Sequence, residues 1–288
     1  MTTSSQAARP VLITGCSTGI GRATAARLAG AGWTVYATAR RPEAIADLRE
    51  AGCQTLALDV VDEESMAAAV RAVEDEHGAV GVLINNAGYS QSGAIEDVPM
   101  AEVRRQFETN VFGLVRCCQL VLGGMRAEGW GKIVNISSMG ANFTFPGGGF
   151  YHATKYAVEA ISDALRFEVK GFGVDVVIIQ PGAIRTNFDT AVVGSITESG
   201  STEGPYALFN QAVAAATVGA YEKGPLARLG GPPEAVAKTI ERAISARHPK
   251  IRYRVTPSAH VLIGQRKLMT DGLWDRFLTS QFPRPGGA

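Results

Sequence analysis

A tyrosine and a lysine stand four residues apart in the stretch YHATK, as Tyr151 and Lys155, within a segment of helical pattern. Residues at positions i and i+4 of a helix share one face, so the phenol and the ammonium can reach the same small volume. A phenol beside an ammonium can give a proton to a carbonyl oxygen or take one from an alcohol. The pair therefore suits proton transfer in a redox reaction, although an exposed helix face can carry the same two residues without a function.

A second stretch that could form a functional site is the glycine-rich TGCSTGIG at residues 14–21. It follows the apolar run PVLIT and precedes an alanine-rich helical pattern over residues 20–31. Gly15, Gly19 and Gly21 allow a tight turn and the close approach of a phosphate to free N–H groups at a helix N-terminus. The spacing GxxxGxG departs from the commoner GxGxxG form. We interpret the stretch as a dinucleotide-binding turn; a plain turn between strand and helix is the alternative.

The expected dinucleotide is NADP(H) rather than NAD(H). The second apolar run ends in YATARR, where an NAD site has an acidic residue for the adenosine ribose hydroxyls. Arg40 instead offers a guanidinium that suits a 2′-phosphate, unless Arg40 and Arg41 are solvated loop charges. Asp59 could accept a hydrogen bond from the adenine amino group, and the stretch NNAG at residues 85–88 could pass close to the adenosine ribose.

These residues stand at the ends of apolar runs that alternate with helical patterns. The runs lie at residues 10–14, 33–39, 54–58, 80–84, 132–137, 174–180 and 251–255, and helical patterns at about 63–77, 100–127 and 151–170. Runs that are apolar throughout are typical of parallel strands buried on both faces, whereas the alternating IRYRV at 251–255 indicates an edge strand. The sequence predicts an α/β fold: a doubly wound, Rossmann-type, mostly parallel seven-stranded sheet with helices on both faces.

Composition limits the classes of function. The 288 residues include 28 Lys plus Arg against 27 Asp plus Glu, which does not suggest a nucleic-acid partner. No apolar run approaches the ~20 residues of a membrane-spanning helix, so no membrane is required. The four cysteines form no CxxC pair and the histidines do not cluster, so no metal site is expected. A reduced, cytoplasmic protein fits these features best.

The expected organisation is a single domain over residues 10–282. Residues 1–9 are interpreted as a flexible leader and residues 283–288 as a flexible tail. Residues 183–230 lack a strand pattern but carry apolar anchors, which favours a lid over a substrate. Residues 256–282 form an apolar and amphipathic C-terminal extension, which could pack on the body of the protein or on a partner.

Six motifs in order resemble those of the short-chain dehydrogenase/reductase family, over almost all of residues 10–255. They are TGCSTGIG, NNAG, the asparagine of ETNVFG, a serine thirteen residues before the tyrosine, YHATK and PGAIRT. The resemblance implies a catalytic tetrad of Tyr151, Lys155, Ser138 and Asn110. Tyr151 would transfer the proton, with its pKa lowered by Lys155 and an oxidised nicotinamide, and Lys155 would also hold the nicotinamide ribose. Ser138 would orient the substrate oxygen, and Asn110 would hold a water for proton relay.

The resemblance also implies the residues around the cofactor. Contacts are expected from Gly15, Ser17, Thr18, Gly19, Ile20, Gly21, Arg40, Asp59, Val60, Asn86, Ala87, Gly88, Tyr151, Lys155, Pro181, Gly182, Ile184 and Thr186. The thirteen-residue interval to the tyrosine selects Ser138 over Ser137, which is expected to pack or position the strand end. His152 points about 100° away from its neighbour Tyr151 along a helix, and we interpret it as a bystander.

The expected substrate is a hydrophobic ketone or secondary alcohol, contacted by Ser138, Phe145 and Tyr151. Phe143, Phe145, Phe150 and Tyr89 could wall a large cleft together with the lid, or could pack in the core. The stretches TGCSTGIG, VYATARR and GYSQSGAIED look most similar to the 17β-hydroxysteroid and retinol dehydrogenase branch, which implies a steroid- or retinoid-like substrate.

Two alternatives remain for the function. A 3-ketoacyl thioester reductase is the alternative enzyme, and a non-catalytic NADP(H)-binding regulatory protein is the alternative of another class. Relatives are commonly dimers or tetramers built on the helices equivalent to 100–127 and 151–170, so the resemblance implies a homodimer or homotetramer.

Overall fold

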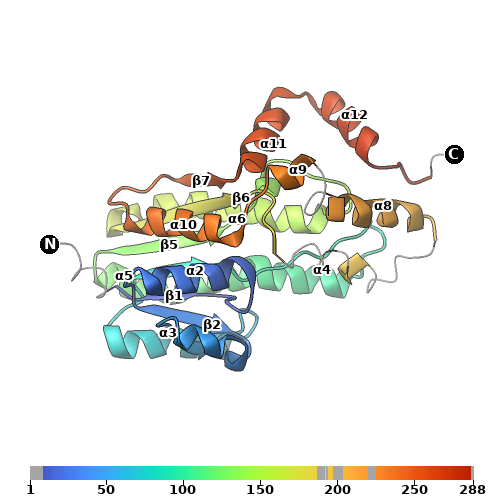
Figure 1. Ribbon diagram of the computed structural model, residues 1–288. Helices are drawn as coiled ribbons and strands as arrows, with labels where there is room; N and C mark the ends of the chain where they lie inside the picture. Colours follow the sequence, from blue (N-terminus) through green and yellow to red (C-terminus); the bar gives the residue numbers. More distant parts are fainter. Residues whose placement is uncertain (1–8, 187–191, 193, 197–203, 220–224, 287–288) are drawn as a thin grey trace.

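A seven-stranded sheet forms the centre of the computed structural model, which describes residues 9–186, 192, 194–196, 204–219 and 225–286 (Figure 1). The strand order is β3-β2-β1-β4-β5-β6-β7, and every neighbouring pair is parallel. The strands are β1 (Val11–Ile13), β2 (Val35–Ala39), β3 (Gln54–Ala57), β4 (Val82–Asn85), β5 (Gly131–Ile136), β6 (Val174–Pro181) and β7 (Arg252–Val255). The predicted doubly wound α/β sheet is therefore confirmed.

Apolar side chains on both faces of the strands explain why helices cover the sheet twice. In β1, Val11 and Ile13 belong to one buried cluster and Leu12 to the other, because successive side chains point to opposite faces. The first cluster includes residues of α2 (Gly19–Gly30) and α10 (Pro233–Ser245). The second includes residues of α3 (Glu63–His77), α5 (Gly113–Ala127) and α6 (Gly149–Val169).

The helical stretch predicted at 100–127 is not one regular helix. It consists of α4 (Met100–Phe107), the π-helical turn η2 (Glu108–Phe112) and α5. A π-turn adds a residue to the helical repeat and changes which side chains face inward, and such turns are frequent at functional sites. The turn holds Asn110 in a buried position.

The last strand and the segment after it build one end of the molecule. Strand β7 is the edge strand, with Tyr253 and Val255 buried and Arg254 exposed, as its alternating sequence predicts. Helices α11 (Pro257–Leu268) and α12 (Asp271–Gln281) follow, and Figure 1 shows them rising away from the sheet. Trp274 of α12 packs in a cluster with Phe143, which follows β5. The C-terminal extension therefore packs on the body of the protein.

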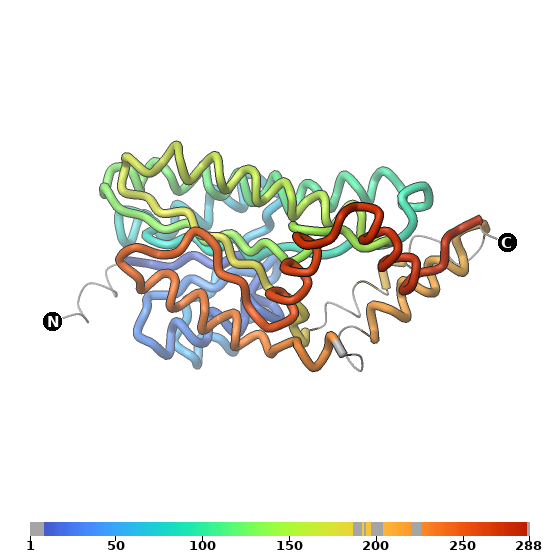
Figure 2. The backbone as a smooth tube through the Cα atoms, turned by 90° about the horizontal axis from the view of Figure 1, so that it is seen from above, coloured from blue at the N-terminus to red at the C-terminus, as the bar shows by residue number. Residues whose placement is uncertain are grey.

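The segment predicted as a lid is described in part. Residues 187–191, 193, 197–203 and 220–224 of this segment lie outside the described residues, as do residues 1–8 and 287–288 of the predicted leader and tail. The described part includes α8 (Ala207–Val218) and α9 (Pro225–Arg228). Figure 2 shows the end of the chain beside α8, where Phe282 packs against a cluster that contains Phe209 and Val213.

Short helices complete the architecture: η1 (Pro42–Arg49), η3 (Met139–Ala141) and η4 (Lys170–Phe172). None of the helices in the described part of the chain combines the length and the hydropathy that crossing a membrane requires. Strands β1 and β4 are neighbours in the sheet although they are not consecutive in the chain, so the strand order reverses between them. Ligands of open α/β sheets bind at such a reversal, beyond the carboxyl ends of the strands.

Candidate active site

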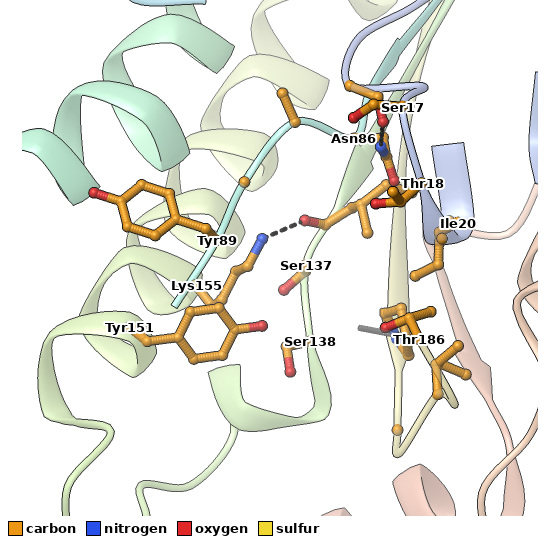
Figure 3. A pocket seen from close by; sticks show the side chains of 18 residues that line it. Ser17, Thr18, Ile20, Asn86, Tyr89, Ser137, Ser138, Tyr151, Lys155 and Thr186 are labelled. Carbon is orange, nitrogen blue, oxygen red and sulfur yellow. Dashed lines mark hydrogen bonds between the residues drawn. The ribbon is translucent and has the colours of Figure 1, made fainter. Parts of the chain in front are cut away.

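A cavity of about 350 Å³ opens at the carboxyl ends of β1, β4, β5 and β6 (Figure 3). Fourteen of the expected cofactor residues line it: Gly15, Ser17, Thr18, Gly19, Ile20, Asn86, Ala87, Gly88, Tyr151, Lys155, Pro181, Gly182, Ile184 and Thr186. The remaining lining residues are Tyr89, Ile136, Ser137 and Ser138. We call this space the dinucleotide cavity. Residues from five separated parts of the sequence thus meet in one place.

The glycine turn has no room for side chains at two positions. Gly15 has φ +73°, and a Cβ placed on it would lie 2.9 Å from the Cα of Ala87. A Cβ on Gly21 would lie 2.3 Å from the carbonyl oxygen of Gly15. Both positions therefore require glycine, for conformation at the first and for packing at the second. The turn leads directly into α2, whose N-terminus is a place where phosphate oxygens are stabilised.

Hydrogen bonds join the glycine turn to the loop that follows β4. The amide nitrogen of the Asn86 side chain donates to the carbonyl oxygens of Thr14 (3.0 Å) and Gly15 (2.9 Å). In return, the Thr14 hydroxyl oxygen accepts from the main-chain N–H groups of Asn86 and Ala87, both at 3.0 Å. Thr14 was not among the expected site residues. A hydroxyl residue between an apolar strand and a glycine turn is the signal that could have indicated it.

The expected catalytic side chains gather at one end of the dinucleotide cavity. Figure 3 shows the Tyr151 hydroxyl, Ser138 and the Lys155 ammonium around a common space, supplied by α6 and by the end of β5. Lys155 Nζ lies 5.7 Å from the centroid of the Tyr151 ring and donates a 2.9 Å hydrogen bond to the carbonyl oxygen of Ile136. Ser138 Oγ accepts a 3.0 Å hydrogen bond from the N–H of Gly140.

Burial dominates the electrostatics of this pair. It raises the pKa of Tyr151 to about 12, opposed by a hydrogen bond with Ser138. It lowers the pKa of Lys155 to about 8, opposed by the negative charge of Glu159 one helical turn away. Desolvation of the phenolate therefore sets the direction of the shift in the protein without cofactor. The lowering of this pKa by Lys155 together with an oxidised nicotinamide stays a prediction. At neutral pH the phenol carries its proton.

Asn110 fastens the loop after β4 to α6. Its Nδ2 donates to the carbonyl oxygen of Tyr89 (2.8 Å) and to the Thr154 hydroxyl (3.1 Å), and its Oδ1 accepts from the N–H of Tyr89 (3.0 Å). Both amide hydrogens are thus used within the protein. The water-holding role implied by the family resemblance stays a prediction.

Four of the expected cofactor residues do not line the dinucleotide cavity: Gly21, Arg40, Asp59 and Val60. Gly21 lies behind the turn, against the carbonyl oxygen of Gly15. Arg40 is exposed after β2, and its side chain makes no hydrogen bond or ion pair with another described residue. Asp59 Oδ1 accepts from the N–H of Val61 at 3.2 Å, and Val60 is buried. Arg40 follows β2, and Asp59 and Val60 follow β3.

A second cavity of about 560 Å³ meets the first at Ser138 and Tyr151, which line both. We call it the apolar cavity. Its walls come from the segment after β5, from the described lid residues and from α11 and α12, and include Met139, Phe143, Phe145, Val192, Val213, Leu226, Leu229, Leu262, Phe277 and Phe282. Phe145 lines it, as expected for a substrate contact.

Two aromatic residues expected at the cleft have other surroundings. Figure 3 shows the Tyr89 ring directed away from the cavity, and the Arg105 guanidinium lies 5.8 Å from its centroid. Phe150 lines neither of the two cavities. The interpretation of these two aromatics as cleft walls is therefore wrong. The sequence places them near the site, but the direction of a ring depends on the elements packed around it.

His152 is not a bystander. The carbonyl oxygen of Gly140 accepts a hydrogen bond from His152 Nδ1 (2.7 Å), and the N–H of Phe145 donates to Nε2 (3.3 Å). Because a carbonyl only accepts and an N–H only donates, the ring is the neutral tautomer with its hydrogen on Nδ1. The imidazole ties α6 to both ends of the segment that follows Ser138. It therefore positions a wall of the apolar cavity, which it also lines.

This arrangement predicts a pH-dependent stability. Burial lowers the pKa of His152 below its ordinary value, opposed by the hydrogen bond to Gly140. Below about pH 6.5 the histidine of the unfolded chain binds a proton more readily than that of the folded protein. The contribution of the neutral ring to the free energy of unfolding is therefore present above about pH 6.5 and is lost as the pH falls through that value. We expect the free energy of unfolding to decrease between about pH 7.5 and about pH 5.5, measured by chemical denaturation.

The matched variant His152→Gln cannot titrate. It should be less stable than the wild type at about pH 7.5, because a hydrogen bond is lost, and should lose less stability on acidification. Equal losses in the two proteins would show that His152 does not cause the dependence.

Comparisons with known proteins agree with the geometry. The family model described as short chain dehydrogenase matches residues 9–195. A 3-ketodihydrosphingosine reductase of Bacteroides thetaiotaomicron is 38% identical over 89% of this chain and 91% of its own length. An NADPH-dependent 3-dehydrocapnine reductase of Ornithobacterium rhinotracheale is 35% identical over 93% of this chain and 95% of its own length. A short-chain dehydrogenase structure from Streptomyces avermitilis superposes with a TM-score of 0.75 at 34% identity, covering 93% of this chain and 94% of its own.

Proposed function

The chain belongs to the short-chain dehydrogenase family of NAD(P)-dependent oxidoreductases, and we propose that it reduces a hydrophobic ketone to a secondary alcohol with NADPH. One observation carries the proposal: Ser138 and Tyr151 line the dinucleotide cavity and the apolar cavity at once. A hydroxyl donor at the junction of a cofactor site and a substrate site touches the reacting carbonyl oxygen.

The lining residues fit a dinucleotide. Because Gly15 and Gly21 have no side chains, the main chain of the turn stays accessible next to the N-terminus of α2, where a pyrophosphate could approach it. Lys155 lines the cavity and would hold the nicotinamide ribose, and Pro181, Gly182, Ile184 and Thr186 also line it. Arg40 offers a free guanidinium for the 2′-phosphate of NADP(H). The relative named as an NADPH-dependent reductase supports the same cofactor.

The proposed mechanism divides the work among the residues of the junction. When bound, NADPH would supply the hydride that the carbonyl carbon accepts. Tyr151 donates its phenolic proton to the carbonyl oxygen, which becomes the hydroxyl of the product. The phenolate then regains a proton from solvent along a path that passes Lys155. Ser138 hydrogen-bonds the same oxygen and fixes its distance from the phenol. The raised pKa of Tyr151 keeps the phenol in the donor form at neutral pH, which suits reduction.

The substrate class follows from the apolar cavity. Its many Phe, Leu, Val and Met side chains favour a ligand with an apolar body that places its carbonyl between Ser138 and Tyr151. The names of two relatives, a 3-ketodihydrosphingosine reductase and a 3-dehydrocapnine reductase, support reduction of a ketone. Within this class, a steroid- or retinoid-like ketone is the substrate proposed from the sequence, and a 3-ketoacyl thioester is the alternative.

The test is NADPH consumption by purified protein with a panel of ketones. The panel contains steroid, retinoid and long-chain aliphatic ketones and a 3-ketoacyl thioester, with a small polar ketone as the control. We expect turnover with at least one apolar ketone and none with the polar control. Tight NADPH binding without turnover on any member would contradict the enzyme proposal and favour a non-catalytic NADP(H)-binding protein.

The cofactor proposal makes its own prediction. Replacement of Arg40 by Ser removes the cation assigned to the 2′-phosphate, so the Kd for NADPH should rise about 10- to 100-fold, the range of a hydrogen bond to a charged group. The Kd for NADH should stay within about two-fold, because NADH lacks that phosphate. Both constants can be measured by cofactor fluorescence. The control Arg71→Ser removes the same charge from the surface of α3 and should change neither.

We also propose a homodimer or homotetramer that uses the helices of residues 100–127 and 151–170. Three aromatic side chains of these segments are exposed: Phe112 (55%), Tyr156 (44%) and Phe167 (84%). Large exposed apolar side chains of this kind are common at subunit interfaces. Light scattering of the wild type and of Phe167→Glu tests this: a monomeric wild type contradicts the proposal.

A further inference from the structure

Ser137 is a buried side chain without a partner. It is 3% exposed, and its Oγ has no hydrogen-bond partner among the described residues. Buried serines elsewhere in the protein are satisfied: Ser162 Oγ donates to the carbonyl oxygen of Val158 (2.6 Å) and accepts from Asn135 Nδ2 (2.9 Å). The main-chain N–H of Ser137 bonds the neighbouring strand at Ile179. The expected packing or positioning of the strand end therefore leaves the hydroxyl itself unused.

The Ser137 hydroxyl faces the dinucleotide cavity. Ser137 lines the dinucleotide cavity and does not line the apolar cavity, whereas Ser138 lines both. Figure 3 shows the Ser137 hydroxyl directed into the space that the Tyr151 hydroxyl also faces, below the bond between Lys155 and Ile136. Ser137 therefore lies beside the expected catalytic side chains, which must adjoin the nicotinamide half of a bound cofactor.

Other unpartnered polar atoms do not share this position. The described residues include five more: Asn85 Oδ1, Tyr89 Oη, Gln106 Oε1, Arg166 Nε and Gln180 Oε1. Only Tyr89 among these five lines the dinucleotide cavity, and its ring points away from it. A buried hydroxyl without a partner costs about 1–3 kcal/mol, and such a group in a native structure calls for a ligand or another explanation.

We propose that Ser137 is a cofactor-binding residue whose Oγ hydrogen-bonds a polar atom of the nicotinamide half of NADP(H). The two adjacent serines then have different tasks. Ser138 contacts the substrate oxygen, and Ser137 contacts the cofactor from the same strand end. This inference rests on the proposed function, because it requires that the dinucleotide cavity binds NADP(H).

The test compares binding and stability in Ser137→Ala. The Kd for NADPH should rise about five-fold, the value of one ordinary hydrogen bond, while the Kd for 2′,5′-ADP, which lacks the nicotinamide half, should not change. The melting temperature of the protein without cofactor should stay the same or rise, because the variant removes an unpartnered buried hydroxyl. Weaker binding together with unchanged or higher stability is a result that a purely structural serine cannot produce.

Ser162→Ala is the matched control, since it removes a buried serine hydroxyl that is fully bonded. Its melting temperature should fall, and its Kd for NADPH should stay at the wild-type value. An unchanged NADPH Kd in Ser137→Ala overturns the inference, and so does an equal loss of affinity for NADPH and 2′,5′-ADP. A wild-type protein that does not bind NADPH overturns the proposed function instead, so the two failures are distinguishable.

Discussion

Replacement of Tyr151 by Phe is expected to lower kcat for ketone reduction by about 10²- to 10⁴-fold, the range for loss of a general acid. The hydroxyl is the only part of the side chain that is removed, and Tyr151 lines both cavities at their junction. Its hydrogen bond with Ser138 is lost as well. The aromatic ring keeps its packing beside Lys155, so the Kd for NADPH should remain within about three-fold of the wild-type value. Steady-state kinetics and cofactor fluorescence measure the two quantities.

The chain offers a control on the same helix. Tyr156 is also on α6, but its side chain is 44% exposed and lines neither cavity. The change Tyr156→Phe removes an identical hydroxyl and should leave kcat unchanged. If Tyr151→Phe retains kcat within about two-fold of the wild type, the phenol is not the proton donor and the mechanism fails.

Replacement of Gly21 by Ala is expected to abolish cofactor binding. The new Cβ would lie 2.3 Å from the carbonyl oxygen of Gly15 and 2.5 Å from Asn86 Nδ2. Neither group can move freely, because Asn86 Nδ2 donates to that same carbonyl oxygen at 2.9 Å. The turn must therefore shift where the pyrophosphate approaches it, and the Kd for NADPH should rise by more than about 100-fold. Overpacking of this kind also costs about 1–3 kcal/mol of stability.

Binding and thermal unfolding test this prediction, and Gly30→Ala is the control. Gly30 is the last residue of the same helix, and a Cβ placed on it has no heavy atom within 4 Å. Its conversion to alanine should leave NADPH binding unchanged and raise stability by up to about 1 kcal/mol. Wild-type affinity in Gly21→Ala would contradict the assignment of the turn to the pyrophosphate.

The arrangement of the sheet was predictable because it depends on short-range patterns. Seven apolar runs correspond to β1 to β7, and the alternating run at 251–255 became the exposed edge. Gly15, Asn86, Ser138 and Pro181 all stand at or just beyond a strand end, and Tyr151 is near the start of the helix that follows β5. Parallel strands bring their carboxyl ends to one edge, so these residues had to meet once the strands were identified.

The directions and environments of side chains were not predictable in the same way. His152 was placed correctly one residue from Tyr151, yet its two hydrogen bonds connect it to Gly140 and Phe145, which only the packing of the segment after β5 brings within reach. Tyr89 was placed near the cleft, but Arg105 of α4 draws its ring the other way. Asn110 was assigned to a regular helix, and a π-turn decides instead where its amide points.

The pKa of Tyr151 likewise has one contribution that the sequence indicates and one that only the tertiary structure determines. Residue types and spacing indicate an attraction between phenolate and ammonium, and this is a pairwise effect that can be estimated from the sequence. The cost of burying the phenolate depends on every atom around it, and in the protein without cofactor this cost raises the pKa of Tyr151.

The sequence by itself determined the fold, the family and the set of residues that meet at the edge of the sheet, because hydrophobic period and motif spacing are local properties of the chain. Only the tertiary structure decided which hydroxyls face which cavity, which histidine bonds hold the segment after Ser138, and which buried serine has no partner. Those features depend on desolvation and on contacts between segments far apart in the chain, and no local pattern records them.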